Sequence, residues 1–442
     1  MHSASAKPMT SSRAGPLSGR LRVPGDKSIS HRSLLLGALA TGTTRITGLL
    51  EGEDVLNTAK AVTALGAPAV KKGDIWEVKG RGVGGLIEPA GELDFGNSGT
   101  GSRLMMGVIA GNDMTVRVVG DASLSKRPMR RVLNPLRQMG LGVLEDRETL
   151  PLTLVGTSRL TPVEYETPVP SAQVKSAILL AGLAALGETT VIEREATRDH
   201  TERMLRYFGG NVRTAERNGM TAITVAGQAE LSGRDVIVPA DPSSAAFLAA
   251  AAAIVPGSEV VIEGVLMNPT RAGFYQTLAE MGGDVVFLEE REAGGETIAD
   301  IRVRHRALKG VRVPPGRAPT MIDEYPILAV VASFAEGETH MEGLAELKVK
   351  ESDRLAVTCA GLLANGVPAT VDGDTLIVQG ARRVSGGGRV ATHMDHRIAM
   401  AFLIMGLGTD RPVGIDDISF VATSFPDFCP IVERLGGNLG SA

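Results

Sequence analysis

The chain reads PGDKSISHRSLLLGALA at residues 24–40, where a polar tip runs directly into an apolar segment. Pro24 and Gly25 begin this stretch and are expected to end the extended segment before it. Asp26 or Ser28 can then cap a following helix. Apolar residues occupy nearly every face of that helix, which is typical of a helix buried in a core. A second segment follows and closes at Gly66, 39 positions after Lys27.

The same arrangement occurs six times along the chain. Each polar tip precedes an apolar run, and a glycine closes a second, amphipathic segment 38 to 43 residues later. The spacing is counted from tip residues Lys27, Asn97, Ser171, Asp241, Asp323 and Asp395 to the glycines Gly66, Gly140, Gly209, Gly282, Gly366 and Gly436. This regularity predicts one structural unit of about 70 residues used six times. A tandem solenoid is the alternative, but such units are long for that class.

Short β-branched or alternating runs follow the helical segments and predict strands at residues 189–193, 222–226, 259–263 and 375–379. Buried helices with strands outside them predict an α/β fold, a two-domain inverted (inside-out) α/β barrel of six repeated βαβαββ-type units, three per domain. The sharpest candidate boundary is at 238–242. We therefore expect one domain at 23–240, a second at 1–22 plus 241–442, and an active site in the interdomain cleft.

The composition excludes several classes of protein. The 442 residues carry 46 basic and 50 acidic side chains, a net charge of −4, whereas a nucleic-acid-binding protein has a basic excess. Two cysteines form no disulfide framework and no metal-binding spacing. No apolar run reaches the roughly 18 residues of a membrane-spanning helix, and no secretory signal is evident. We expect a cytoplasmic protein that binds neither membrane nor nucleic acid.

The tips of the first half offer cations, hydroxyls and amides at predicted helix starts. Lys27 and Arg32 add full positive charge to the free amides and dipole of a helix N-terminus, an arrangement that suits phosphate or carboxylate. NSGTGSR at 97–103 would allow a ligand close to its backbone, and KRPMRR at 126–131 aims Arg127 outward from a helix start. Capped helices, glycine turns and solvated charged faces are the structural alternatives. The remaining tips of this half lie at 171–176 and 198–201.

The second half supplies acid–base groups. Asp323 opens an apolar helix, and KVKESDR at 348–354 interleaves cations with carboxylates, although a salt-bridge network would also explain that pattern. His393 and His396 lack a convincing third ligand, so no metal is predicted. The cations at equivalent tips are Lys27, Arg32, Arg127, Lys350, Arg354 and Arg397. If the tips converge, they would bind small polyanions, with Asp323 and Glu351 positioned for proton transfer.

Several motifs together resemble the EPSP synthase family, the 3-phosphoshikimate 1-carboxyvinyltransferases. They are PGDKSISHR at 24–32, GNSGT at 96–100, KRPM at 126–129, DEYP at 323–326, KESDR at 350–354 and DHR at 395–397. The resemblance extends from about residue 20 to 437, and the spellings SAQVK at 171–175 and TSFPD at 423–427 are similar to the bacterial class II branch. It implies a shikimate-pathway transferase of aromatic amino acid biosynthesis, the target of glyphosate. The implied enzyme joins phosphoenolpyruvate to shikimate 3-phosphate without metal or organic cofactor, and we expect a monomer.

The resemblance also implies roles for individual residues. Shikimate 3-phosphate would be bound by Lys27, Ser28, Arg32, Ser171, Ala172, Gln173, Arg198, Asp323 and Lys350. Phosphoenolpyruvate would be bound by Lys27, Gly99, Arg127, Gln173, Arg354 and Arg397. Asp323 would accept the proton of the attacking 5-hydroxyl, while Lys27 and Glu351 are candidates for the other proton steps. Some relatives carry Lys where this chain has Thr423, so one phosphoenolpyruvate contact would be missing. Glyphosate is predicted to fit beside Gly99 and to be blocked by Gly99→Ala.

Two other functions fit parts of the sequence. The related transferase that uses UDP-N-acetylglucosamine typically has a reactive Cys on a mobile loop, and the equivalent stretch here, Gly120–Ala122, has none. A non-catalytic sensor of phosphorylated metabolites would keep the cations but would not need Asp323 and Glu351. Phosphate release from the two substrates would distinguish such a sensor from an enzyme.

Overall fold

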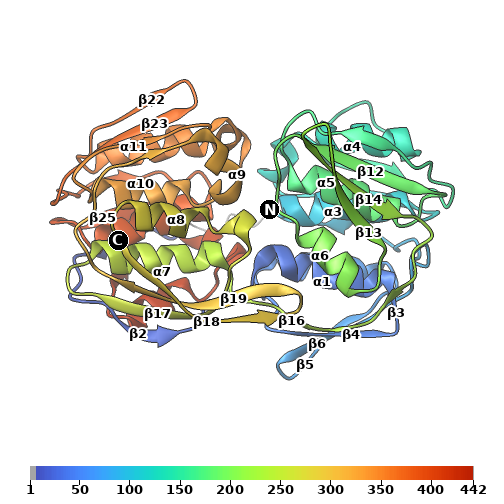
Figure 1. Ribbon diagram of the computed structural model, residues 1–442, viewed down its shortest axis with the longest axis horizontal. Coiled ribbons are helices and arrows are strands. Elements are labelled where there is room, and N and C mark those ends of the chain that lie inside the picture. Colours follow the sequence, from blue (N-terminus) through green and yellow to red (C-terminus); the bar gives the residue numbers. More distant parts are fainter. Residues whose placement is uncertain (1–5, 442) are drawn as a thin grey trace. The chain divides into compact units, whose positions relative to one another are not determined.

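The computed structural model describes residues 6–441 and divides into two compact units (Figure 1). Unit 2 comprises Gly25–Val238 together with the short segment Glu292–Glu296. Unit 1 comprises the chain up to Pro24, Pro239–Arg291 and the chain from Thr297 onward. The backbone therefore passes from unit 1 to unit 2 at Pro24–Gly25 and returns at Val238–Pro239, and it enters unit 2 again for the short segment Glu292–Glu296.

Four-stranded sheets of one topology recur in the described part of the chain, three in each unit. In each sheet the first strand pairs in parallel with the second, and the second pairs antiparallel with the third. The sheets of unit 2 are β16(Asp235–Ile237)-β4(Thr43–Thr47)-β6(Ile75–Lys79)-β5(Ala69–Lys72), β7(Leu93–Asp94)-β8(Thr115–Val119)-β10(Leu152–Val155)-β9(Gly142–Val143) and β11(Glu164–Glu166)-β12(Glu188–Glu193)-β14(Met220–Ala226)-β13(Val212–Arg217). The sheets of unit 1 are β2(Ser18–Leu21)-β17(Glu259–Leu266)-β19(Glu296–Arg304)-β18(Asp284–Ala293), β20(Arg312–Val313)-β21(Gly337–Met341)-β23(Thr375–Gly380)-β22(Ala369–Asp372) and β24(Arg389–Val390)-β25(Val413–Ile415)-β1(Met9–Ser12)-β26(Asn438–Ser441). A further short pair joins β15(Leu231–Ser232) to β3(Ala40–Thr41).

Each four-stranded sheet goes with one buried helix and one amphipathic helix, which completes the repeated unit. The helices lie inside each unit and the sheets outside them (Figure 1). The buried helices are α1(Lys27–Leu39), α3(Gly99–Ala110), α5(Ala172–Gly182), α7(Pro242–Ile254), α10(Tyr325–Ser333) and α12(His396–Gly406). Their amphipathic partners are α2(Glu53–Ala64), α4(Arg130–Met139), α6(His200–Tyr207), α8(Gly273–Glu280), α11(Arg354–Ala364) and α13(Phe428–Arg434). The short α9(Ala318–Met321) precedes α10. The predicted inside-out α/β barrel is therefore the observed fold.

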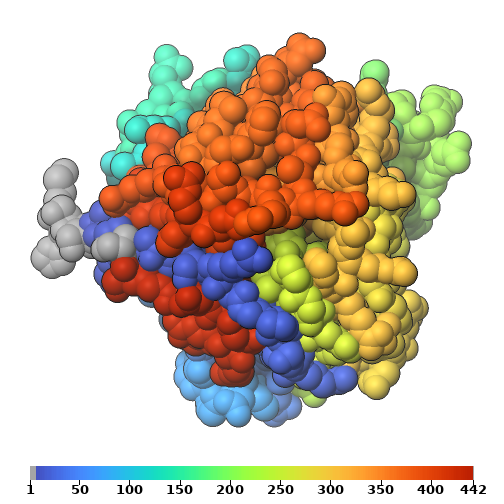
Figure 2. Space-filling model, turned by 90° about the vertical axis from the view of Figure 1, so that its left-hand side faces the viewer, coloured from blue at the N-terminus to red at the C-terminus, as the bar shows by residue number. Residues whose placement is uncertain are grey.

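Segments distant in sequence complete the circle of sheets. The N-terminal strand β1 lies between β25 and β26, pairing Met9 with Ile415 on one side and Ser441 on the other. Figure 2 shows the blue N-terminal segment crossing this face of unit 1 between red segments. Likewise β2 pairs in parallel with β17, and β16 pairs in parallel with β4. The sequence repeat alone did not predict these exchanges, because the pairing strands belong to different repeats.

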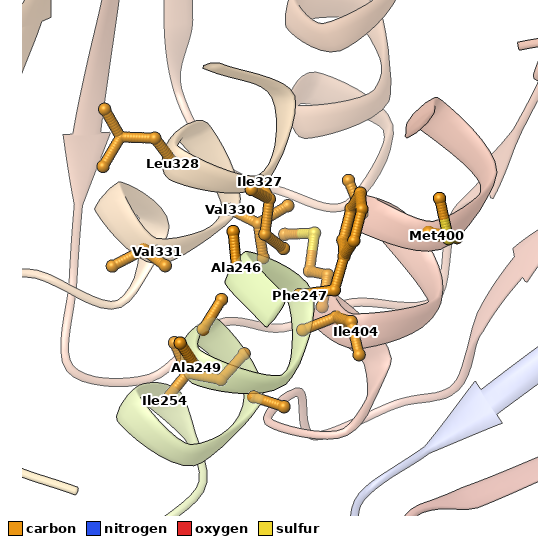
Figure 3. Close-up of a cluster of buried hydrophobic side chains, with 14 of the residues drawn as sticks. Ala246, Phe247, Ala249, Ile254, Ile327, Leu328, Val330, Val331, Met400 and Ile404 are labelled. Carbon is orange, nitrogen blue, oxygen red and sulfur yellow. The ribbon is translucent and has the colours of Figure 1, made fainter. Parts of the chain in front are cut away.

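The core of unit 1 forms where α7, α10 and α12 meet (Figure 3). Every residue of α7 is buried, because its run of alanines lets neighbouring helices approach from all sides. Phe247 of α7, Ile327 of α10 and Ile404 of α12 point into this cluster (Figure 3). In unit 2, α3 packs closely on α5. A Cβ on Gly107 would lie 2.2 Å from the carbonyl oxygen of Ala177, so only glycine permits this approach.

The six repeat glycines end the amphipathic helices. Each adopts a left-handed backbone, with φ between +78° and +118°, which residues with a Cβ rarely adopt. The predicted stripe on α4 is also observed, since Val132, Leu133, Leu136 and Met139 are all buried. Within residues 6–441, no helix combines the length and apolar character that a membrane crossing requires.

Candidate active site

The polar tips lie at the N-termini of the buried helices, where side chains cap the first turn. Asp26 accepts a hydrogen bond from the Ile29 amide at 2.7 Å, and Ser98 accepts one from the Gly101 amide at 3.1 Å. Ser171 caps α5 through the Val174 amide at 3.4 Å, and Asp395 caps α12 through the Arg397 amide at 3.0 Å. Each tip therefore stands at the positive end of a helix dipole, where anions are favoured.

Lys27 begins α1 and is paired with a carboxylate that sequence reasoning missed. Its Nζ lies 3.0 Å from Asp54 Oδ2, and both side chains are largely buried. Asp54 belongs to the first turn of α2, where a carboxylate also complements that helix dipole. The Glu-Asp pair at this helix start was the available sequence signal. Lys27 is thus held in place by the second helix of its own repeat.

Gly99, Arg127 and Gln173 are brought close together in unit 2. Arg127 donates to Asn97 Oδ1 and to Ser123 Oγ, and a Cβ on Gly99 would lie 2.9 Å from Arg127 Nη1. The Gln173 amide nitrogen donates to Thr100 Oγ1 at 2.9 Å. The α3 and α5 tips therefore share one polar surface.

Arg103 also belongs to this group, although it was not predicted as a site residue. Its Nη1 donates to Gln173 Oε1 at 2.6 Å, and its Nη2 donates to the Pro128 carbonyl at 3.2 Å. It lies on α3, in the predicted tip at 97–103. Its place in that tip was the available sequence signal.

Arg32 is buried inside unit 2 rather than displayed at its surface. The guanidinium donates to the Ser28 carbonyl at 3.0 Å, Ser176 Oγ at 2.8 Å and Thr201 Oγ1 at 2.7 Å. These contacts join α1, α5 and α6, and Ser28 lies one turn before Arg32 on the same helix. Arg32 therefore has a structural task that the sequence did not reveal.

The segment that carries Arg198 is supported by a buried ion network. Lys175 Nζ lies 2.8 Å from both Glu193 Oε2 and Glu202 Oε1. Thr197, next to Arg198, donates through its hydroxyl to Glu193, and its carbonyl accepts from Lys175 Nζ at 3.4 Å. Burial lowers the pKa of Lys175, but Glu202 and Glu193 outweigh it and the pKa is raised. Burial raises the pKa of Glu202, although Lys175 opposes that shift. Ala172 and Ser171 lie at the start of the helix that carries Lys175.

A second ion network surrounds the start of α6 in unit 2. His200 Nδ1 is hydrogen-bonded to Glu296 Oε1 at 2.9 Å, and Arg203 Nε donates to Asp199 Oδ2 at 2.7 Å. Asp199, His200 and Glu296 present potential metal-ligating atoms within 4.8 Å of one another. Arg203 also lies 3.7 Å from Glu296, so it already balances both carboxylates. We therefore describe this cluster as an ion-pair network.

Arg354 is the centre of the polar group in unit 1. Its side chain is 1% exposed, and its Nε lies 2.8 Å from Asp395 Oδ2. Nη1 donates to Asp323 Oδ1 at 3.1 Å, and Nη2 donates to Glu351 Oε2 at 2.5 Å. Lys350 Nζ lies 3.6 Å from the same Asp323 oxygen. The structure thus brings together four predicted site residues, Asp323, Lys350, Glu351 and Arg354. It adds the carboxylate of Asp395, which the sequence analysis noted only as part of a polar tip.

Arg397 lies beside the same group at the start of α12. Its Nη1 donates to the Asp323 carbonyl at 3.4 Å and lies 3.8 Å from Glu324 Oε1. The preceding residues His393 and Met394 both have positive φ, of 51° and 63°, which side chains with a Cβ rarely adopt. This strained backbone leads directly into Asp395. The tips of unit 1 therefore do not form a purely basic surface, since every predicted cation there lies near a carboxylate.

Thr423 ends the short 3-10 helix Ser419–Thr423 of unit 1, which contacts α12. Its hydroxyl donates to the Phe420 carbonyl at 2.6 Å, and the residue is buried. It therefore supplies no charge where some relatives are expected to have Lys.

Two solved structures of enolpyruvyl-transferring enzymes share the fold of this chain. The chain superposes on the enolpyruvyl transferase NikO from Streptomyces tendae with a TM-score of 0.78 over 99% of each chain, and at 18% identity this shows a shared fold. The EPSP synthase structure from Acinetobacter baumannii matches with a TM-score of 0.87 and 44% identity, over 99% of this chain and 100% of that one.

The family follows from sequence comparison. The model of EPSP synthase (3-phosphoshikimate 1-carboxyvinyltransferase) matches residues 12–432. A 3-phosphoshikimate 1-carboxyvinyltransferase of Methylobacterium radiotolerans is 59% identical over the full length of both chains. The protein of that name from Bradyrhizobium diazoefficiens is 58% identical, over 98% of this chain and 94% of its own. The chain belongs to the EPSP synthase family.

Proposed function

We propose that the chain transfers the enolpyruvyl group of phosphoenolpyruvate to the 5-hydroxyl of shikimate 3-phosphate, giving 5-enolpyruvylshikimate 3-phosphate and phosphate. Its membership of the EPSP synthase family supports this reaction. The single structural observation that carries it is the contact of Arg354 with Asp323 and Glu351. A sensor of phosphorylated metabolites would not require two carboxylates on one arginine, and family membership does not favour transfer to UDP-N-acetylglucosamine.

The assignment of individual residues to the two substrates is part of the proposal. Shikimate 3-phosphate is bound by Lys27, Ser28, Arg32, Ser171, Ala172, Gln173, Arg198, Asp323 and Lys350. Phosphoenolpyruvate is bound by Lys27, Gly99, Arg127, Gln173, Arg354 and Arg397. The capped helix starts support these assignments, because their amides and dipoles favour phosphate and carboxylate groups.

The chemistry is an addition followed by an elimination. Asp323, which lies beside Arg354 and Lys350, accepts the proton of the 5-hydroxyl as that oxygen attacks C2 of phosphoenolpyruvate. C3 receives a proton from Lys27 or Glu351, and a tetrahedral intermediate forms. That intermediate then loses a proton from C3 and releases phosphate, which restores the double bond. Fixed cations stabilise the charge that develops on the phosphate and carboxylate groups.

The test replaces the proposed base. Asp323→Ala should abolish phosphate release from the two substrates, measured in a coupled assay, while shikimate 3-phosphate still binds in a calorimetric titration. Asp372→Ala, at an exposed aspartate of the same unit, is the matched control and should retain turnover. Full activity of Asp323→Ala would remove the proposed base, and a wild-type chain that releases no phosphate would remove the proposed reaction.

We further propose that the chain acts as a monomer in the cytoplasm. Its two cysteines form no disulfide with each other, which is compatible with a reducing compartment. Light scattering that gives a mass near 46.2 kDa would support a monomer, and twice that mass would contradict it.

A further inference from the structure

Glu324 is a buried carboxylate that the proposed reaction does not use. It is 2% exposed and directly follows the proposed base, at the start of α10. Among the described residues, neither of its carboxylate oxygens has a hydrogen-bond partner. Burying a carboxylate without hydrogen bonds is costly, so we expect a nearby positive charge to stabilise it.

The nearby cation is Arg397 of α12. Glu324 Oε1 lies 3.8 Å from Arg397 Nη1, close enough for charge attraction but too far for a hydrogen bond. The guanidinium makes a long bond of 3.4 Å to the Asp323 carbonyl, and its side chain is 10% exposed. The charge of Glu324 also acts on Tyr275: the pKa of that phenol is raised well above its usual value, mainly by burial and secondly by Glu324.

Arg354 provides the contrast within the same unit. Its donors are engaged at hydrogen-bond distance by three carboxylates, those of Asp323, Glu351 and Asp395. Arg397 instead lies near the charge of Glu324, and among the described residues its guanidinium donates only the long hydrogen bond to the Asp323 carbonyl. Such a guanidinium can still offer paired N–H groups to an incoming planar carboxylate.

We propose that Glu324 is the counter-ion of Arg397 in the ligand-free enzyme, and that the carboxylate of phosphoenolpyruvate competes with it for this arginine. The inference rests on the proposed function, in which Arg397 binds phosphoenolpyruvate. Glu324 stabilises the buried arginine before substrate arrives, and it weakens the attraction of Arg397 for the substrate anion. It is therefore a positioning residue that sets the affinity for phosphoenolpyruvate.

The direction of this effect separates it from a purely structural role. Glu324→Gln preserves size but removes the charge, so Arg397 becomes an uncompensated buried cation. We expect the KM for phosphoenolpyruvate to fall about three- to tenfold at saturating shikimate 3-phosphate, while the KM for shikimate 3-phosphate changes less than twofold. The ligand-free variant should also melt at a lower temperature. A residue that merely anchors Arg397 would raise the KM instead.

Three further variants complete the experiment. Asp300→Asn removes an equally buried carboxylate of unit 1, which pairs with Arg20 and Arg291, and should leave the KM for phosphoenolpyruvate unchanged. Glu324→Asp shortens the side chain and draws the charge away from Arg397, so it should lower that KM by a smaller factor if Glu324→Gln does not fold. Arg397→Gln should raise that KM at least tenfold.

The outcomes distinguish failure of the counter-ion role from failure of the proposed reaction. An unchanged or raised KM for phosphoenolpyruvate in Glu324→Gln or, where that variant does not fold, in Glu324→Asp, together with wild-type turnover, overturns the counter-ion role and leaves the reaction standing. An unchanged KM in Arg397→Gln overturns it as well, because the arginine would then not bind this substrate. Absence of turnover by the wild-type chain removes the proposed function itself and the inference with it.

Discussion

Lys175→Met tests whether the buried ion network of unit 2 holds the third repeat together. The Lys175 side chain is 1% exposed, and its ammonium nitrogen lies 2.8 Å from one oxygen each of Glu193 and Glu202. Methionine fills a similar volume but leaves two buried carboxylates without their cation. Removing one partner of a buried ion pair typically costs about 3–5 kcal/mol, and we expect a loss in that range.

The carboxylates make a double-mutant cycle possible. Glu202→Gln alone should cost less than Lys175→Met, because Lys175 keeps its contacts with Glu193 and the Thr197 carbonyl. In Lys175→Met/Glu202→Gln only one buried carboxylate, that of Glu193, remains without its cation. The double variant should therefore be more stable than the sum of the single effects predicts, with a coupling energy of about 1–3 kcal/mol.

The assay is urea unfolding followed by tryptophan fluorescence. Trp76 on β6 is the only tryptophan of the chain, so its emission reports on unit 2. Arg213→Met is the matched control, because Arg213 forms an exposed ion pair with Glu188 in the same repeat. Exposed pairs contribute about 0–1 kcal/mol. Equal stability of Lys175→Met and Arg213→Met would refute the argument that burial makes this network strong.

Other predictions concern Gly99 and His31. The methyl of Gly99→Ala would lie 2.9 Å from Arg127 Nη1, so we expect a KM for phosphoenolpyruvate about 5- to 30-fold higher and weaker glyphosate inhibition. Gly91→Ala, with open space around its Cβ, should change neither constant, and equal inhibition of Gly99→Ala and wild type would reject the clash. Burial, followed by Lys27 and Arg32, lowers the pKa of His31 well below 6.5. The unfolded chain therefore binds this proton first, so stability should fall as pH drops below 6.5, by up to ~1.4 kcal/mol per pH unit. Unfolding at pH 5.5 and 7.5 should show a smaller difference for His31→Gln, and an identical difference would exclude His31 as the cause.

The repeat could be predicted because its signals are local. A capping side chain, an apolar run and a closing glycine lie within one repeat, and each reflects the geometry of a single helix end. Gly140 illustrates this, since the pattern before it predicted a helix end and its φ is +118°. The predicted stripe of α4 was correct for the same reason, because helical periodicity places those residues on one face.

The contacts of the candidate site were harder to predict. KESDR at 350–354 revealed charges of both signs, and a salt-bridge network was one reading of that pattern. It did not reveal that Arg354 bonds Asp395 on another helix. The sequence also did not reveal that Arg32, a predicted ligand of shikimate 3-phosphate, contacts Ser176 and Thr201 on two other helices. No spacing within one segment encodes such partners.

The sequence by itself determined the repeated helix ends, the buried and amphipathic faces, and the reactive groups carried at each tip. These properties follow from dihedral preference and periodicity over a few residues. Only the tertiary structure decided that β1 completes the sheet of β25 and β26, and that Glu324 faces Arg397. Strand pairing and charge compensation depend on segments far apart in the chain, which become neighbours only when the cores of the units are packed.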